Sequence, residues 1–74
     1  MTDFRTHIQN AVKAAGSQKA LADAVGISQQ GVSYLLTDAK NCSTDMAMAI
    51  EKATGGEVTR SMLRPDIWAP EQAA

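Results

Sequence analysis

The sequence predicts an all-α domain built from five short helices. Alanine, leucine, isoleucine, valine and methionine recur at spacings of three and four residues, which is the period of an amphipathic helix. The polar segments between these stripes contain glycine, serine, threonine and proline, and no pair of alternating segments predicts a strand pair. With 74 residues the chain suffices for one domain with a modest core, and it is too short for a deep active-site cleft.

The first two predicted helices occupy residues 3–15 and 18–25. Thr2 is the expected N-cap of the first helix, Gly16 ends it, and Ser17 caps the second helix. The residues expected to form the buried stripe of the first helix are Phe4, Ile8, Ala11, Val12 and Ala15.

A tight turn at Gly26 and Ile27 leads into a third helix over residues 29–36. Glycine suits the left-handed backbone conformation that a side chain with a Cβ would strain. Ala22 is small enough for the third helix to cross closely over it, and Ser28 offers a hydroxyl cap. The residues expected to be buried from the third helix are Val32, Leu35 and Leu36.

The second half of the chain predicts two more helices. Residues 37–42 form a polar connection, after which Ser43 or Thr44 can cap a fourth helix that reaches Ala53. The expected inward side of this helix consists of Met46, Ala49, Ile50 and Ala53.

After Gly55 and Gly56, Thr59 can cap a fifth helix over residues 60–63, and Pro65 prevents its continuation. Residues 69–74 are expected to be a flexible tail, so the predicted domain covers residues 1–68.

Two stretches of this pattern resemble known regulators. Residues 18–36, with the sequence QKALADAVGISQQGVSYLL, resemble the helix-turn-helix of the Cro and repressor proteins of lambdoid phages and prophages. Residues 53–68, with the sequence ATGGEVTRSMLRPDIW, resemble the C-terminal part of small Cro-like prophage proteins, the YdaS-like antitoxin family. The resemblance implies a lambda-repressor-like fold and a stand-alone transcriptional repressor that binds operator DNA as a dimer.

In repressors of this kind the third helix enters the major groove by its N-terminal end. The residues expected to be exposed there, and therefore to contact bases, are Gln29, Gln30, Ser33 and Tyr34. A glutamine can bond adenine N6 and N7 together, which contributes about 1–3 kcal/mol of discrimination. Gln29 is the first choice for this role. Gln30 could instead reach a phosphate, and Tyr34 could instead be a half-buried rim aromatic.

Phosphate contacts are expected beside the third helix. In the resembling repressors a glutamine at the start of the second helix grips the DNA backbone, and Gln18 stands at that place. The other candidates are Lys19, Ser28, Lys40 and Asn41. The net charge of −1 and pI near 5.6 predict modest affinity for each protomer. A homodimer on a near-palindromic operator is therefore expected, with residues 57–68 as its contact surface.

Other classes of function find little support. The single Cys42 excludes an internal disulfide and leaves no thiolate cluster for zinc, which fits a reducing cytoplasm. No apolar run is long enough to span a bilayer, and the N-terminus does not read as a secretory signal. His7 has no partner at metal-ligand spacing, and no catalytic triad or phosphate loop is present, so we expect no enzyme, metal or cofactor.

Several side chains are expected to be structural. Cys42 should be a small, semi-buried residue, and Trp68 should fold back over the core rather than anchor a dimer. Arg64 and Asp66 can form a local pair. The residues expected to fill the core, with at most one or two facing a partner, are Met46, Met48 and Met62.

Two rival functions remain open at this point. The first is an antitoxin that binds a protein toxin and autoregulates its operon. The second is an interaction domain that has lost its contact with DNA, which the acidic pI makes conceivable.

Overall fold

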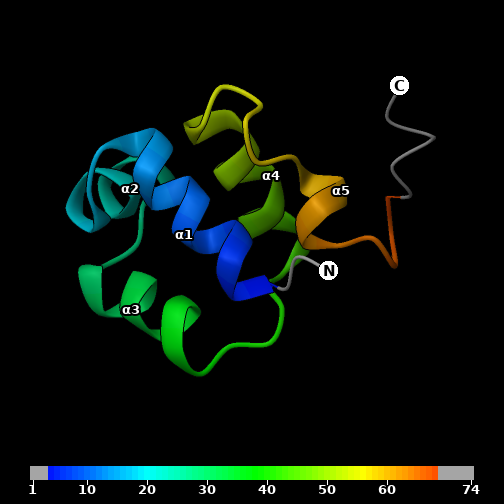
Figure 1. The fold of residues 1–74 in the computed structure, drawn as a ribbon, viewed down its shortest axis with the longest axis horizontal. Helices are drawn as coiled ribbons and strands as arrows, with labels where there is room; N and C mark the ends of the chain where they lie inside the picture. The colour runs from blue at the N-terminus through cyan, green and yellow to red at the C-terminus, as the bar shows by residue number, and fades with distance from the viewer. Residues whose placement is uncertain (1–3, 69–74) are drawn as a thin grey trace.

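The computed structural model describes residues 4–68, and within that range the chain forms five α-helices and no strand (Figure 1). The helices are α1 (Phe4–Ala15), α2 (Gln18–Val25), α3 (Gln29–Thr37), α4 (Thr44–Ala53) and α5 (Arg60–Leu63). The all-α expectation is thus confirmed, and α3 extends one residue beyond its predicted end. The expected cap at Thr2 and the tail at residues 69–74 lie outside the described residues.

Helices α2 to α5 each begin directly after a hydroxyl side chain that caps them. In each case the hydroxyl oxygen accepts a hydrogen bond, 3.0–3.3 Å long, from the backbone N–H three residues further along. This arrangement satisfies a donor that the first turn of a helix cannot pair internally. The capping residues are Ser17, Ser28, Ser43 and Thr59, so Ser43 rather than Thr44 begins α4.

The turn between α2 and α3 depends on Gly26. Its φ of +81° places it in the left-handed region, as the sequence predicts. The N–H groups of Gly26 and Ile27 both donate to the carbonyl oxygen of Ala22 at 2.9 Å. Ala22 itself is only 1% exposed, which agrees with the expectation of a close helix crossing. The first two helices of the motif are therefore joined by a short, hydrogen-bonded corner.

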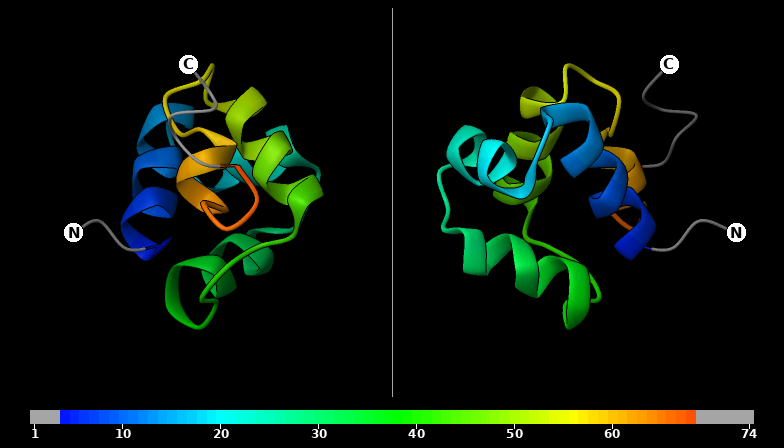
Figure 2. Two further views of the ribbon diagram at one scale, coloured as in Figure 1. Left: turned by 90° about the vertical axis from the view of Figure 1, so that its right-hand side faces the viewer. Right: turned by 60° about the vertical axis from the view of Figure 1, so that its left-hand side comes forward.

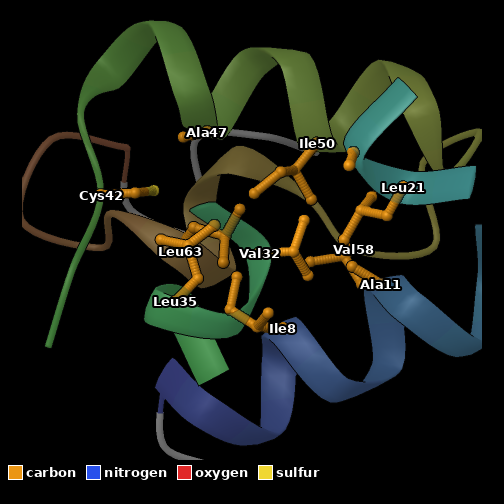
Figure 3. Close-up of a cluster of buried hydrophobic side chains, with 11 residues drawn as sticks. Ile8, Ala11, Leu21, Val32, Leu35, Cys42, Ala47, Ile50, Val58 and Leu63 are labelled. Atoms are coloured by element: carbon orange, nitrogen blue, oxygen red, sulfur yellow. The ribbon is translucent and has the colours of Figure 1, made fainter. Parts of the chain in front are cut away.

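All five helices and the segment after α4 contribute to one apolar core, part of which is drawn in Figure 3. Helix α4 packs against both α2 and α5, and α1 contacts each of the other four helices. The largest fully buried side chains are Ile8, Leu21, Val32, Ile50 and Val58. Leu35 is buried, whereas Leu36 is only half-buried and lies at the edge of this core.

The inward side of α4 differs from the prediction. The predicted stripe began at Met46, but Ala47 and Ile50 are fully buried and Thr54 follows them, while Met46, Ala49 and Ala53 are half-buried. The fully buried side thus shares Ile50 with the prediction and shifts toward Ala47 and Thr54, while Met46 and Ala53 pack against the core at its edge. The predicted stripe is the more apolar of the two, because the observed one ends at the polar Thr54, so apolar spacing alone favoured the predicted stripe. Thr54 is satisfied where it is buried, since its hydroxyl donates to Ile50 O at 2.9 Å.

The end of the described chain packs on the domain. Trp68 is half-buried and lies against the core, as the sequence predicts. The guanidinium of Arg60 stands 5.3 Å from the centre of its ring, within the range of a cation–π interaction. Figure 2 shows that the segment after α5 leaves that helix on the side where α3 and the start of α4 lie. Within residues 4–68 no helix is long and apolar enough to cross a membrane.

Candidate nucleic-acid interface

Helix α3 has one buried side and one exposed side. Val32 and Leu35 point into the core, with 0% and 7% of their surface exposed. The four side chains predicted to contact bases, Gln29, Gln30, Ser33 and Tyr34, are all exposed. Tyr34 is 58% exposed, more than the half-buried rim position that the sequence left open. The structure therefore presents these four polar side chains to solvent on one short helix.

Gly31 is held close to the turn that precedes α3. A Cβ at this position would lie 3.2 Å from Cδ1 of Ile27, which is tighter than ordinary van der Waals contact. The neighbour of Gly31 is thus Ile27, a residue of the turn between α2 and α3. The absence of a side chain at Gly31 thus leaves room for Ile27 to pack closely against α3.

The start of α2 lies beside α3. Gln18 and Lys19 are exposed in the first turn of α2. Their backbone N–H groups precede that of Ala20, which donates a hydrogen bond to the hydroxyl oxygen of Ser17. Gln18 and Leu36 of α3 line the same surface hollow of about 490 Å³. The helix N-terminus carries a partial positive charge that favours an anion. Gln18 is thereby placed on one side of α3.

The α3–α4 connection, which we define as residues 38–43, brings the next two candidates beside α3. Lys40 and Asn41 are both exposed. Asn41 and Tyr34 line a second cavity of about 460 Å³, so the connection folds back along α3. Ser28, the remaining candidate, is exposed and its oxygen already accepts from Gly31 N at 3.1 Å. Its hydroxyl hydrogen is therefore the group that remains to donate to a phosphate.

Arg5 is a basic residue near α3 that the sequence reasoning missed. Its Nη2 donates to the carbonyl oxygen of Thr37, the last residue of α3, at 3.3 Å. Arg5 also shares a surface hollow with Lys40. Two cations thus stand near the C-terminal end of α3, where Asp38 is the only acidic residue of the connection. Arg5 and Thr37 are 32 residues apart, and no local pattern predicts a contact at that separation.

Cys42 anchors the connection to the domain. Its side chain is buried, with 7% exposed, which is somewhat deeper than the semi-buried position expected. Burial raises the pKa of the thiol because it disfavours the thiolate, and the nearby charge of Arg64 opposes this only in part. The thiol is therefore protonated at neutral pH. In the described part of the chain no three His, Cys, Asp or Glu side chains are grouped to hold a metal, and His7 is half-buried in α1.

The comparison with protein families gives a match over most of the chain. Residues 8–71 match the family model described as bacterial toxin YdaS. The chain belongs to this family. The description names a toxin, whereas the resemblance of residues 53–68 suggested an antitoxin.

Two known proteins, one a curated relative and one a solved structure, are similar to this chain. The chain is 36% identical over 59 residues to an Escherichia coli K12 protein provisionally named transcriptional regulator YdaS. The match covers 80% of this chain and about 60% of that relative's length. The fold resembles the Cro protein from a proposed prophage element, Xfaso 1, in Xylella fastidiosa strain Ann-1. The TM-score is 0.77 at 30% identity, covering 85% of this chain and 95% of that one.

Proposed function

We propose that this chain is a Cro-like transcriptional regulator that binds operator DNA with α3 in the major groove. The observation that carries the proposal is the exposure of Gln29, Gln30, Ser33 and Tyr34 on a helix whose opposite side is buried. The N-terminal half of a recognition helix is the part that meets base edges in helix-turn-helix proteins. The likeness to a Cro protein and to a protein named as a transcriptional regulator supports the same function.

We assign base recognition to Gln29 and Gln30 and backbone binding to the side chains that flank α3. Glutamine can donate and accept at one base edge, which suits adenine. The proposed phosphate contacts are Gln18, Lys19, Ser28, Lys40 and Asn41. Three of these five side chains are uncharged, so neutral hydrogen-bond donors and helix N-termini supply much of the binding to the phosphates of DNA.

The proposed active species is a cytoplasmic homodimer without catalytic activity. Only two of the five proposed phosphate contacts of one protomer are cations, so counterion release is modest, and a second copy provides a second set of phosphate contacts. Two-fold symmetry then predicts a near-palindromic operator with half-sites about 34 Å apart. The surface proposed for the dimer is residues 57–68, where Met62 and Ile67 are 44% and 42% exposed.

The test is a gel-shift titration against the DNA immediately upstream of the gene, at two salt concentrations. We expect a discrete complex whose affinity falls as salt rises, and whose affinity exceeds that for shuffled DNA of the same composition. Equal affinity for the two DNAs would remove the proposal of sequence-specific regulation.

A second candidate function follows from the family description, which names a bacterial toxin. In this case the chain would act on a protein partner, or be neutralised by one. Growth after induced expression separates the two functions when the wild type is compared with a Gln29→Ala, Gln30→Ala double variant. Growth arrest that persists in the double variant would favour a protein target, whereas arrest lost together with DNA binding would favour repression.

A further inference from the structure

Arg64 joins two parts of the chain that are 22 residues apart. Its Nη1 donates to the carbonyl oxygen of Cys42 at 2.7 Å. Its Nε and Nη2 donate to the two carboxylate oxygens of Asp66 at 3.0 and 2.8 Å. The side chain of Arg64 is only 20% exposed, although that of Asp66 is 63% exposed. The guanidinium is therefore largely covered between the α3–α4 connection and the turn after α5.

The two partners fix the orientation of the guanidinium. A planar guanidinium that binds a carboxylate by two parallel hydrogen bonds has little rotational freedom left. Asp66 thus holds Arg64 so that Nη1 points at Cys42 O. The hydrogen bond from Arg64 lowers the pKa of Asp66, and the pKa of Arg64 is raised in return. The pair accordingly remains charged on both sides at neutral pH.

The α3–α4 connection has no helix or strand of its own between Asp38 and Ser43. Cys42 is held by two contacts, because its side chain is buried and its carbonyl oxygen accepts a hydrogen bond from Arg64. Lys40 and Asn41 directly precede this fixed point. Arg64 also lines the 460 Å³ cavity that Asn41 shares with Tyr34 of α3. The position of these side chains relative to α3 thus depends on the bond from Arg64.

We propose that Arg64 is a positioning residue for DNA binding. It holds the α3–α4 connection so that Lys40 and Asn41 reach the backbone beside the groove that α3 enters. Arg64 does not itself hold a phosphate, because Asp66 neutralises its charge and the two partners use three of its five N–H donors. This inference rests on the proposed function and adds a residue whose influence passes through the connection.

The main test compares Arg64→Lys with Arg60→Lys. Lysine retains the charge but lacks the planar fork, so it cannot bind Asp66 by two bonds and still reach Cys42 O. Arg60 is the matched control: it is the first residue of α5, Arg64 directly follows that helix, and Arg60 contacts Glu51 at 3.5 Å and the ring of Trp68. Folding of both variants is checked by far-ultraviolet circular dichroism and a urea titration.

The first readout needs no DNA. The rate at which iodoacetamide alkylates Cys42 in the folded protein reports how firmly the connection is held. We expect Arg64→Lys to accelerate this alkylation by more than its loss of global stability in the urea titration accounts for. Arg60→Lys should leave the alkylation rate at the wild-type value. Equal protection of Cys42 in Arg64→Lys and wild type would overturn the anchoring role.

The second readout is binding to a duplex that wild-type protein has selected from a random pool. Each phosphate contact of a cation makes binding about eightfold tighter at 0.1 M salt than at 1 M salt, so losing one such contact weakens binding at 0.1 M salt by about that factor. We expect Arg64→Lys to weaken binding by up to this factor for each phosphate that the variant no longer binds. In a Lys40→Ala, Asn41→Ala background the same substitution should have no further effect. Effects that simply add in this background would contradict action through the connection.

Asp66→Asn covers the case in which Arg64→Lys does not fold. This variant keeps Arg64 and frees part of its charge. A positioning role predicts either unchanged binding and salt slope or weaker binding with a shallower slope, whereas a direct phosphate contact predicts tighter binding and a slope steeper by about one. If wild-type protein selects no DNA site, the proposed function fails and the role in DNA binding fails with it. The alkylation rate still decides whether Arg64 anchors Cys42.

Discussion

Replacing Gly26 by alanine tests the turn on which the placement of α3 depends. Gly26 has φ of +81°, and a Cβ built on it meets no atom within 4 Å. The cost of Gly26→Ala is therefore backbone strain without a steric clash. A left-handed residue with a Cβ costs about 1–2 kcal/mol. With a urea slope near 1 kcal/mol/M, typical of a small domain, the unfolding midpoint should fall by about 1–2 M.

Two further substitutions separate strain from other causes. Gly26→Asn should cost less than Gly26→Ala, because asparagine tolerates the left-handed region better. Gly31→Ala makes the same chemical change within a helix, where a gain of about 1 kcal/mol in helix propensity opposes crowding against Ile27 Cδ1 at 3.2 Å. Equilibrium urea unfolding followed by circular dichroism at 222 nm measures all three. A midpoint for Gly26→Ala equal to that of wild type would refute the strained turn.

Three further predictions concern the apolar core, the contacts with the DNA phosphates and the thiol of Cys42. Ile50→Ala should cost about 2–5 kcal/mol in urea unfolding because Ile50 is fully buried. Met48→Ala, 39% exposed on the same helix, should change the free energy of unfolding by less than about 0.5 kcal/mol. Lys40→Ala should reduce the salt slope of DNA binding by about one, whereas Lys52→Ala, which removes the same charge from α4, should leave it unchanged. Because burial raises the pKa of Cys42, the folded protein holds this proton more tightly than the unfolded chain, and stability should fall above about pH 8.5. Cys42→Ala should remove that part of the decline, and an unchanged pH profile would contradict it.

Much of the fold could be predicted because its signals are local. The caps at Ser17, Ser28 and Thr59 act on residues three positions away, and Gly26 acts on its own backbone. A sequence window of a few residues contains all the information that such features need. The same reasoning placed Gln29 and Gln30 at the exposed start of α3.

The features that were missed depend on how helices cross. Arg5 meets the end of α3 across 32 residues, and Arg64 meets Cys42 across 22. The sequence predicted the Arg64–Asp66 pair, which is local, but it gave no sign of the third bond. Ala47 and Thr54 are more deeply buried than Met46 because α4 packs against α2 and α5 on that side, which apolar spacing alone does not indicate. Long-range contacts of this kind follow from the three-dimensional arrangement.

Selection of binding sites from a random DNA pool by wild-type protein and by Gln29→Ala tests the central claim most directly. We predict that wild-type protein enriches two symmetric half-sites spaced by about one helical turn, roughly 34 Å. Gln29→Ala should lose preference at one base position of each half-site while keeping the spacing. Enrichment of the same sites with unchanged base preference, or no enrichment by wild-type protein, would contradict the account of α3 as the DNA-reading helix.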